Sequence, residues 1–350
     1  MNLLQLLHQS GQSVWLDGFE RGWISGGELQ RVIEEEGLRG IRSNFQSLQA
    51  AMEGQEYDRD FTTLAQQGTS RTAQSDYNYM IVRDLQLAAD LLKPVHSQTQ
   101  GRDGYVQVDL SPEAVLQPET AIATAQSLWQ SVGWSNLLVS IPATPLMLPL
   151  IEQLIGDRIN VNATFVFSPT VYEQVFNQYL LGLERLVQQG ESASEVVCFA
   201  SVAIGCLDSV VDSGLANPEP CFSGMQAKLL YQRYRLLRDR DRQRSLPEGA
   251  KPPRLVWDCS DIPSESAGWY LQQFAFPETV MLLSPSTLEM YRRVSLIRNH
   301  WTNGEPGGLF NELRESLLDE QVEQLVNQAM ARSLTDFHHL LNTIEHKRRR

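Results

Sequence analysis

The chain has 350 residues, of which 42% are hydrophobic, and it carries a formal net charge of −13. A chain of this composition can bury a large core, and its negative charge argues against a general nucleic-acid binder. It contains no run of about 18 apolar residues, and its start, MNLLQLLHQSGQS, lacks a basic leader, so we expect no membrane association, no secretion and a cytoplasmic location.

Short apolar strands alternate with helical segments along most of the chain. We expect a first strand within 12–19 that ends at Asp17. Further strands are expected over 40–44, 105–110, 137–141, 159–169, 195–204, 254–260 and 279–284. Helical periodicity predicts helices over 27–36, 46–52, 58–66, 75–93, 120–132, 171–188 and 226–241, with Pro94 ending the fourth. Eight strands separated mostly by helices predict a parallel α/β sheet closed into a (β/α)8 TIM barrel, which we expect to form a single domain over 1–350.

The end of the chain predicts an additional long helix over 320–345. Its apolar residues, among them Leu325, Phe337, Leu340 and Ile344, fall on one stripe. We expect this stripe to dock on the barrel, and binding of a partner protein is the alternative. The segments 212–224 and 295–308 are rich in turn residues and are expected to be loops, the first of them a second candidate for a partner contact.

Few residues in this chain could supply covalent or metal chemistry. Only four of the 29 basic residues are lysines, namely Lys93, Lys228, Lys251 and Lys347. The six histidines all fall outside the predicted strand ends, so we expect no metal site and no cofactor. The four cysteines form no CxxC pair, and we expect reduced thiols.

Several short motifs occur at the predicted strands in a fixed order. They are QSVWLD, GLRG, RDGYV, SNLLVSIPATP at 135–145, INVNATFVFS and AKLLYQRY. In this order they resemble the transaldolase family, and the resemblance covers nearly the whole chain. It implies a (β/α)8 barrel related to the sugar-phosphate enzymes of the pentose phosphate pathway, with a sugar phosphate or related metabolite as ligand.

The resemblance also assigns roles to five polar residues at the carboxyl ends of strands, where barrel active sites are built. Asp17 matches the aspartate that transfers a proton during carbon–carbon cleavage. Asn44 matches an asparagine that contacts substrate hydroxyls, and Ser201 a serine on the substrate side. Asn162 and Thr164 match the pair that supports the Schiff base and orders a water. Five such residues in family register favour a retained polar pocket over simple strand capping.

Three residues depart from the family pattern where the chemistry demands most. Ser140 stands where the family has the Schiff-base lysine before Ile-Pro-Ala-Thr, and a hydroxyl cannot condense with a ketone to an imine. Asp109 replaces a glutamate that acts as general acid and base, which withdraws the carboxylate by one methylene. Arg42 replaces a threonine, and strand alternation would let it fill the lysine's space and pair with Asp17 or Asp109.

The phosphate site implied by the family is altered as well. Cys206 stands where the family carries an arginine, so a bidentate donor is lost. Asp258 and Asp261 follow the seventh strand where the family has serine, threonine and lysine. Negative charge near a phosphate lowers its affinity, so the usual sugar phosphate is expected to bind weakly here.

Three hypotheses follow. The first is a transaldolase-like barrel that has lost the Schiff-base reaction, a pseudoenzyme that binds a metabolite or a partner. The second is an active transaldolase or aldolase that uses a displaced lysine, or a lyase that works through the Asp17 and Asp109 carboxylates. The third is a regulatory subunit recognised through its C-terminal helix or the 212–224 loop.

Overall fold

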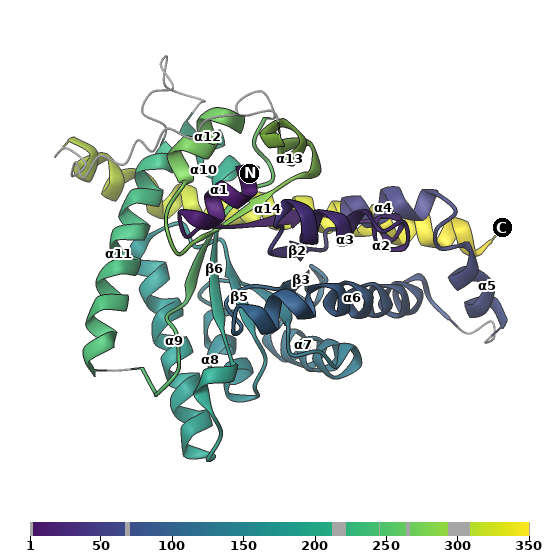
Figure 1. Cartoon of the computed structure of the whole chain (residues 1–350), viewed down its shortest axis with the longest axis horizontal. Coiled ribbons are helices and arrows are strands. Elements are labelled where there is room, and N and C mark those ends of the chain that lie inside the picture. The colour runs from purple at the N-terminus through teal and green to yellow at the C-terminus, as the bar shows by residue number, and fades with distance from the viewer. Residues whose placement is uncertain are drawn as a thin grey trace.

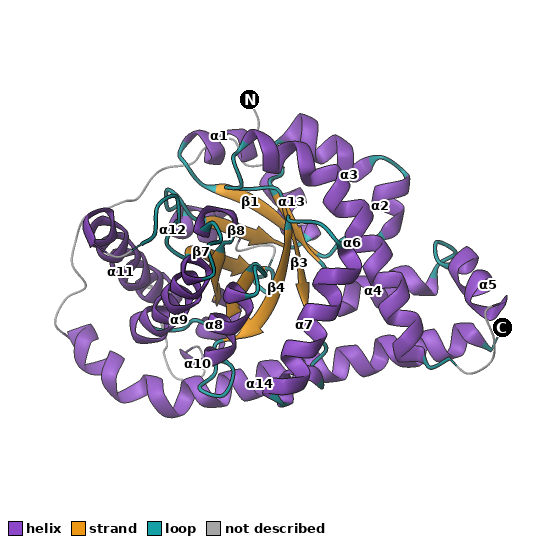
Figure 2. Cartoon of the chain, turned by 90° about the horizontal axis from the view of Figure 1, so that it is seen from below, coloured by secondary structure: helices purple, strands orange, loops and turns teal. Residues whose placement is uncertain are grey.

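A computed structural model of the chain describes residues 3–66, 71–211, 222–244, 246–263, 267–292 and 309–349. Its centre is a closed barrel in which all eight strands run parallel and each strand pairs with its neighbours in chain order. Figure 2 shows this ring of strands enclosed by helices. The predicted (β/α)8 barrel is therefore confirmed.

Seven of the eight strands are shorter than the sequence patterns predicted, because the pattern does not separate the last paired residue from the loop that follows it. They are β1 Ser13–Asp17, β2 Gly40–Arg42, β3 Tyr105–Asp109, β4 Leu137–Pro142, β5 Val161–Thr164, β6 Cys198–Ala203, β7 Arg254–Cys259 and β8 Val280–Leu283. The largest difference is in the fifth strand, where the expected span 159–169 contains only four paired residues. Only strand β4 is longer than expected, since Pro142 belongs to it.

Alternate residues of the strands fill the barrel interior. An aromatic cluster of Trp15, Tyr105 and Phe199 lies at its amino-terminal end, where the ring centroids of Trp15 and Phe199 are 5.1 Å apart. Gly40 pairs with Trp15 across β1 and β2, and a Cβ there would lie 2.6 Å from the indole. The missing side chain thus makes room for the largest residue of the cluster.

Helices surround the barrel and extend to one side of it (Figure 1). They are α1 Leu3–Gln9, α2 Arg21–Ser25, α3 Glu28–Arg31, α4 Phe45–Glu53, α5 Asp58–Gln66, α6 Ala73–Gln98, α7 Pro118–Val132, α8 Leu148–Gly156, α9 Pro169–Gln188, α10 Ile204–Val211, α11 Phe222–Arg244, α12 Ala267–Phe274, α13 Pro285–Arg292 and α14 Leu309–Arg348. A π-helical turn, Val32–Glu36, ends the predicted helix 27–36. None of the helices in the described ranges is long and apolar enough to cross a membrane.

Helix α6 corrects one expectation, because it does not stop before Pro94 but continues to Gln98. Pro94 lacks an N–H and removes one hydrogen bond from the helix. Leu92 and Val95 on either side of it are buried in the core, and α6 packs on β3. Packing of this last turn outweighs the lost bond.

Helix α14 docks on the rest of the molecule through the predicted apolar stripe. Its residues Phe337, Leu340 and Ile344 are fully buried, and the Phe337 ring contacts those of Phe45 and Tyr77 at centroid distances of 5.0 and 5.4 Å. The helix packs against α4, α6 and α10 and passes the carboxyl ends of the strands, toward which the strand arrows point (Figure 2). Docking is therefore confirmed. The loop predicted over 295–308 and residues 212–221 of the other predicted loop lie outside the described residues.

Candidate active site

An arginine joins three strands at the carboxyl end of the barrel. Arg42, the last residue of β2, donates from Nε to Asp17 of β1 at 2.6 Å and from Nη1 to Asp258 of β7 at 2.7 Å. Its Nη2 lies 3.4 Å from the Ser260 hydroxyl, which in turn donates to Asp258. The exposed fractions of the three charged side chains are only 9–14%, so the network is largely shielded from water.

Burial and charge act in opposite directions on this network. Burial raises the pKa of the Asp17 carboxyl, against the lowering effect of the Arg42 guanidinium and a hydrogen bond from Asn44. Burial lowers the pKa of the Arg42 guanidinium, but the carboxylates of Asp17, Asp258 and Asp109 outweigh burial and raise this pKa well above its ordinary value. Arg42 is therefore a permanent cation, and it has no proton to give at neutral pH.

Ser140 lies at the centre of the barrel beside strand β3. Its Oγ accepts a 2.9 Å hydrogen bond from Gln107 Nε2, and it pairs in register with Asp109 across β3 and β4. Gln107 Nε2 is also 3.5 Å from Asp109 Oδ1. The Ser140 hydroxyl is thus held by an amide and not by a base that could activate it as a nucleophile.

The fifth and sixth strands contribute the other polar residues expected from the resemblance. Ser201 Oγ donates to Asn162 Oδ1 at 2.9 Å, while the buried Asn162 Nδ2 has no partner among the described residues. Thr164 ends β5, and Phe165 after it has φ of +62°. A left-handed conformation is unusual for a bulky residue, and here it accompanies an aromatic side chain at the mouth of the barrel.

Asn44 bonds to Asp17 and caps a helix, and it does not line the cavity. It is the N-cap of α4, and its Oδ1 accepts a 2.7 Å hydrogen bond from the Ser47 N–H. It is absent from the residues that line the cavity at this end of the barrel. Capping explains why β2 ends at Arg42 and not at the predicted residue 44, since the N-cap starts the next helix.

A small cavity of about 100 Å³ lies among these groups. Five of the eight sequence-predicted site residues line it, and Asp17, Asn44 and Asn162 do not. Met330 and Ser333 of α14 also line it, so the C-terminal helix closes the cavity from above the strand ends. The complete lining is Arg42, Asp109, Leu110, Pro112, Val115, Ser140, Pro142, Thr164, Phe165, Ser201, Ala203, Asp258, Met330 and Ser333.

The sequence pointed to some of these residues better than to others. Gln107 was missed, although it stands two residues before Asp109 and so faces the same side of β3. Met330 and Ser333 carry no signal in the sequence, because their position depends on how α14 docks. Asp258 belongs to β7 itself and not to the loop after it.

The residues expected at the altered phosphate site lie close to acidic groups. Cys206 lies in the first turn of α10, after the sixth strand, and is buried. Burial, with the nearby charges of Asp261 and Asp258, raises the pKa of its thiol to about 11. Burial and the Asp258 charge likewise raise the pKa of Asp261. Neighbouring carboxylates at this edge repel one another and would repel an anion.

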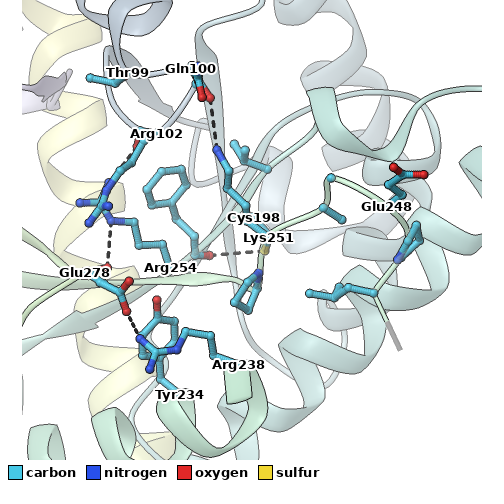
Figure 3. A pocket seen from close by; sticks show the side chains of 18 residues that line it. Thr99, Gln100, Arg102, Cys198, Tyr234, Arg238, Glu248, Lys251, Arg254 and Glu278 are labelled. Atoms are coloured by element: carbon cyan, nitrogen blue, oxygen red, sulfur yellow. Dashed lines mark hydrogen bonds and ion pairs between the residues drawn. The ribbon is translucent and has the colours of Figure 1, made fainter. Parts of the chain in front are cut away.

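All four lysines belong to the described residues, and none lines the cavity. Lys93 Nζ lies 4.0 Å from the centroid of the Trp134 ring, and Lys347 bonds to the Gly54 carbonyl and Asp58. Lys251 donates to the Gln100 carbonyl at the amino-terminal end of the barrel (Figure 3). Lys228 lies on α11, in the helical layer around the barrel.

The fold and the polar strand ends define a (β/α)8 barrel with an enzyme-like cluster at its carboxyl face. The family model described as transaldolase/fructose-6-phosphate aldolase matches residues 14–344. The chain belongs to this family. Over 99% of its length it is 29% identical to a transaldolase of Trichodesmium erythraeum (strain IMS101), of which 97% is covered. It is also 30% identical to the transaldolase of Mycobacterium tuberculosis (strain ATCC 25618 / H37Rv) over 86% of this chain and 84% of that protein.

Proposed function

We propose that this chain is a pseudoenzyme of the transaldolase family, in which the mouth of the barrel no longer performs Schiff-base transfer. Membership of a family of sugar-phosphate enzymes makes transaldolase chemistry the first candidate. The observation that argues against it is the absence of any lysine from the lining of the carboxyl-end cavity. An imine needs a primary amine within bonding distance of the ketone carbon.

The size of the cavity supports the same proposal. Small-molecule sites usually have volumes of about 300–1,000 Å³, and one water takes about 30 Å³ of liquid volume. A cavity of about 100 Å³ therefore has room for a few waters and not for a six-carbon sugar phosphate. Helix α14, which carries Met330 and Ser333, would have to move away from the strand ends before such a substrate could enter.

The charges at the mouth also disfavour a phosphorylated substrate. Of the charged side chains that line the cavity, Asp109 and Asp258 are anionic and Arg42 alone is cationic. The Arg42 guanidinium is already held by Asp17 and Asp258. A phosphate dianion would have to compete with these two carboxylates for the arginine.

Borohydride trapping tests the proposal directly. The protein is incubated with fructose 6-phosphate and sodium borohydride, and its intact mass is measured beside that of a transaldolase with a lysine before its Ile-Pro-Ala-Thr run. We expect the mass of this chain to stay unchanged while the control gains a reduced sugar adduct. An adduct on any lysine of this chain would refute the proposal and favour a displaced-lysine transaldolase.

A turnover assay covers the second alternative, in which the carboxylates act without an amine. Fructose 6-phosphate and erythrose 4-phosphate are supplied together, and release of glyceraldehyde 3-phosphate is followed through a coupled dehydrogenase. The proposal expects no signal above the protein-free blank. Turnover that is lost in an Asp109→Asn variant, without a trapped adduct, would instead show chemistry through the carboxylates.

A further inference from the structure

A larger cavity, of about 580 Å³, lies at the amino-terminal end of the barrel. Its walls come from residues 99–102 before β3, the first residues of β6 and β7, the loop 246–252 and helix α11. Phe199 on its wall belongs to the aromatic cluster with Trp15 and Tyr105. The two cavities have no lining residue in common, so this cavity is separate from the one at Ser140.

The cavity is rich in cations although the chain is acidic. Its lining contains Arg102, Arg238, Lys251 and Arg254 against the two carboxylates of Glu248 and Glu278 (Figure 3). Four cations around one cavity of a protein with a net charge of −13 are a local concentration of positive charge. Such clusters attract anions into concave sites.

Two of these cations are already used by the protein. Arg254 donates five hydrogen bonds, to the carbonyls of Glu278, Arg102 and Thr279, to the Ser13 hydroxyl and to the Asp103 carboxylate. Arg238 forms ion pairs with Glu278 and Asp239. Both arginines therefore hold the barrel base together and have little capacity left for a ligand.

Arg102 and Lys251 differ from them, because neither has a carboxylate within ion-pair distance in the described part of the chain. Arg102 Nη2 donates to the Gly11 carbonyl at 3.2 Å, and Lys251 Nζ donates to the Gln100 carbonyl at 3.2 Å. Burial lowers the pKa of both groups, as does the charge of Arg254, and the Arg102 charge adds to the effect on Lys251. An anion between the two side chains would relieve this repulsion.

The rest of the wall is apolar and aromatic. Phe199, Tyr234, Leu246 and Pro247 line the cavity beside the two cations. The volume of about 580 Å³ falls in the usual range for sites that hold small organic molecules. A ligand with an anionic group at one end and an organic body at the other would match the cationic and the apolar parts of this lining.

We propose that the amino-terminal cavity binds a small phosphate monoester, with its phosphate between Arg102 and Lys251 and its organic part against Phe199 and Tyr234. A phosphate dianion balances the two unpaired cations, and its three oxygens can accept from both side chains at once. The site is independent of the chemistry at Ser140, and the proposal holds whether or not the barrel mouth is catalytic.

Isothermal titration of the full chain at physiological ionic strength tests this, with inorganic phosphate, fructose 6-phosphate and adenosine monophosphate as probes. At least one ester should bind at least tenfold more tightly than inorganic phosphate. The two esters distinguish a sugar from a nucleoside as the organic part. Equal affinity for all three probes, or no binding below about 10 mM, would overturn the proposal.

Variants locate the binding. Lys251→Gln and Arg102→Gln should each weaken the bound ester about tenfold or more, because each removes a hydrogen bond to a charged group, and Lys251→Arg should retain binding. Lys93→Gln and Arg158→Gln are matched controls on cations distant from this cavity, and their affinity should be unchanged. Unaltered melting temperatures verify folding. Affinity that survives both Lys251→Gln and Arg102→Gln would refute this site.

Discussion

Replacement of Arg42 by methionine tests whether the ion network now stabilises the barrel mouth. Methionine keeps the length of the side chain but removes the charge, so Asp17 and Asp258 lose their shared partner. Breaking a buried ion pair from one side costs about 3–5 kcal/mol, because the remaining charge stays buried and uncompensated. The exposed fractions of 9–14% place this network in that class.

Urea unfolding at pH 7.5 measures the free energy of unfolding of the wild type and of Arg42→Met. The control is Arg158→Met, since the exposed fraction of Arg158 is 47% and its ion pairs with Glu191 and Glu195 lie on the surface. Surface pairs contribute about 0–1 kcal/mol. A triple variant with Asp17→Asn and Asp258→Asn beside Arg42→Met should recover much of the loss, because it leaves no unpaired charge.

The loss of unfolding free energy in Arg42→Met should depend on pH. Burial already raises the pKa of Asp17 in the folded protein, and removing Arg42 takes away the main lowering influence. A carboxyl whose folded pKa lies above its unfolded value of about 3.9 favours the folded state when protonated, and it destabilises that state as pH rises. The difference between Arg42→Met and wild type should therefore be larger at pH 8 than at pH 5. Equal losses in Arg42→Met and Arg158→Met, or no dependence on pH, would refute the reasoning.

Two further predictions concern the barrel core and its thiols. Gly40→Ala should lower the free energy of unfolding in urea by about 1–3 kcal/mol, because its Cβ would lie 2.6 Å from the Trp15 indole. Gly268→Ala is the control and should be neutral or slightly stabilising, because no neighbouring atom of the described residues lies within 4 Å of its Cβ. Similar effects at both sites would contradict this prediction. Cys206, whose thiol has a pKa of about 11, should react with iodoacetamide at pH 8 on the order of a hundredfold more slowly in native than in unfolded protein, as peptide mapping would measure. Equal rates would show that the thiol is accessible.

The fold could be predicted because its signals are local and repeated. Each strand is a short apolar run followed by turn residues, and eight such runs between helices leave few arrangements other than the barrel. Ends of elements were less predictable, as Asn44 and Pro94 illustrate. Asn44 caps a helix where a strand was expected, and Pro94 lies inside a helix that packing extends to Gln98.

For the candidate site, strand alternation predicts which residues point into the barrel, but not which of them contact one another. Alternation places Arg42, Asp109 and Ser140 inside the barrel, and all three line the cavity. It does not say which residues meet across the barrel, because that depends on the stagger of strands far apart in sequence. The bond between Arg42 and Asp258, 216 positions apart, and the closure by Met330 are of this kind.

Two arginines connect strands at opposite ends of this barrel, and one of them belongs to the candidate site. Arg254 at the amino end connects β7 to Ser13 of β1 and to residues before β3 and β8 through five hydrogen bonds. Arg42 connects β1, β2 and β7 at the carboxyl end, where it bonds to the predicted site residue Asp17. A lysine introduced at Ser140 would have to extend past Gln107, whose Nε2 lies 2.9 Å from Ser140 Oγ, into a cavity of about 100 Å³. On the proposed function, a Ser140→Lys substitution alone should not restore Schiff-base transfer, because Arg42 and its two carboxylate partners would still occupy the strand ends.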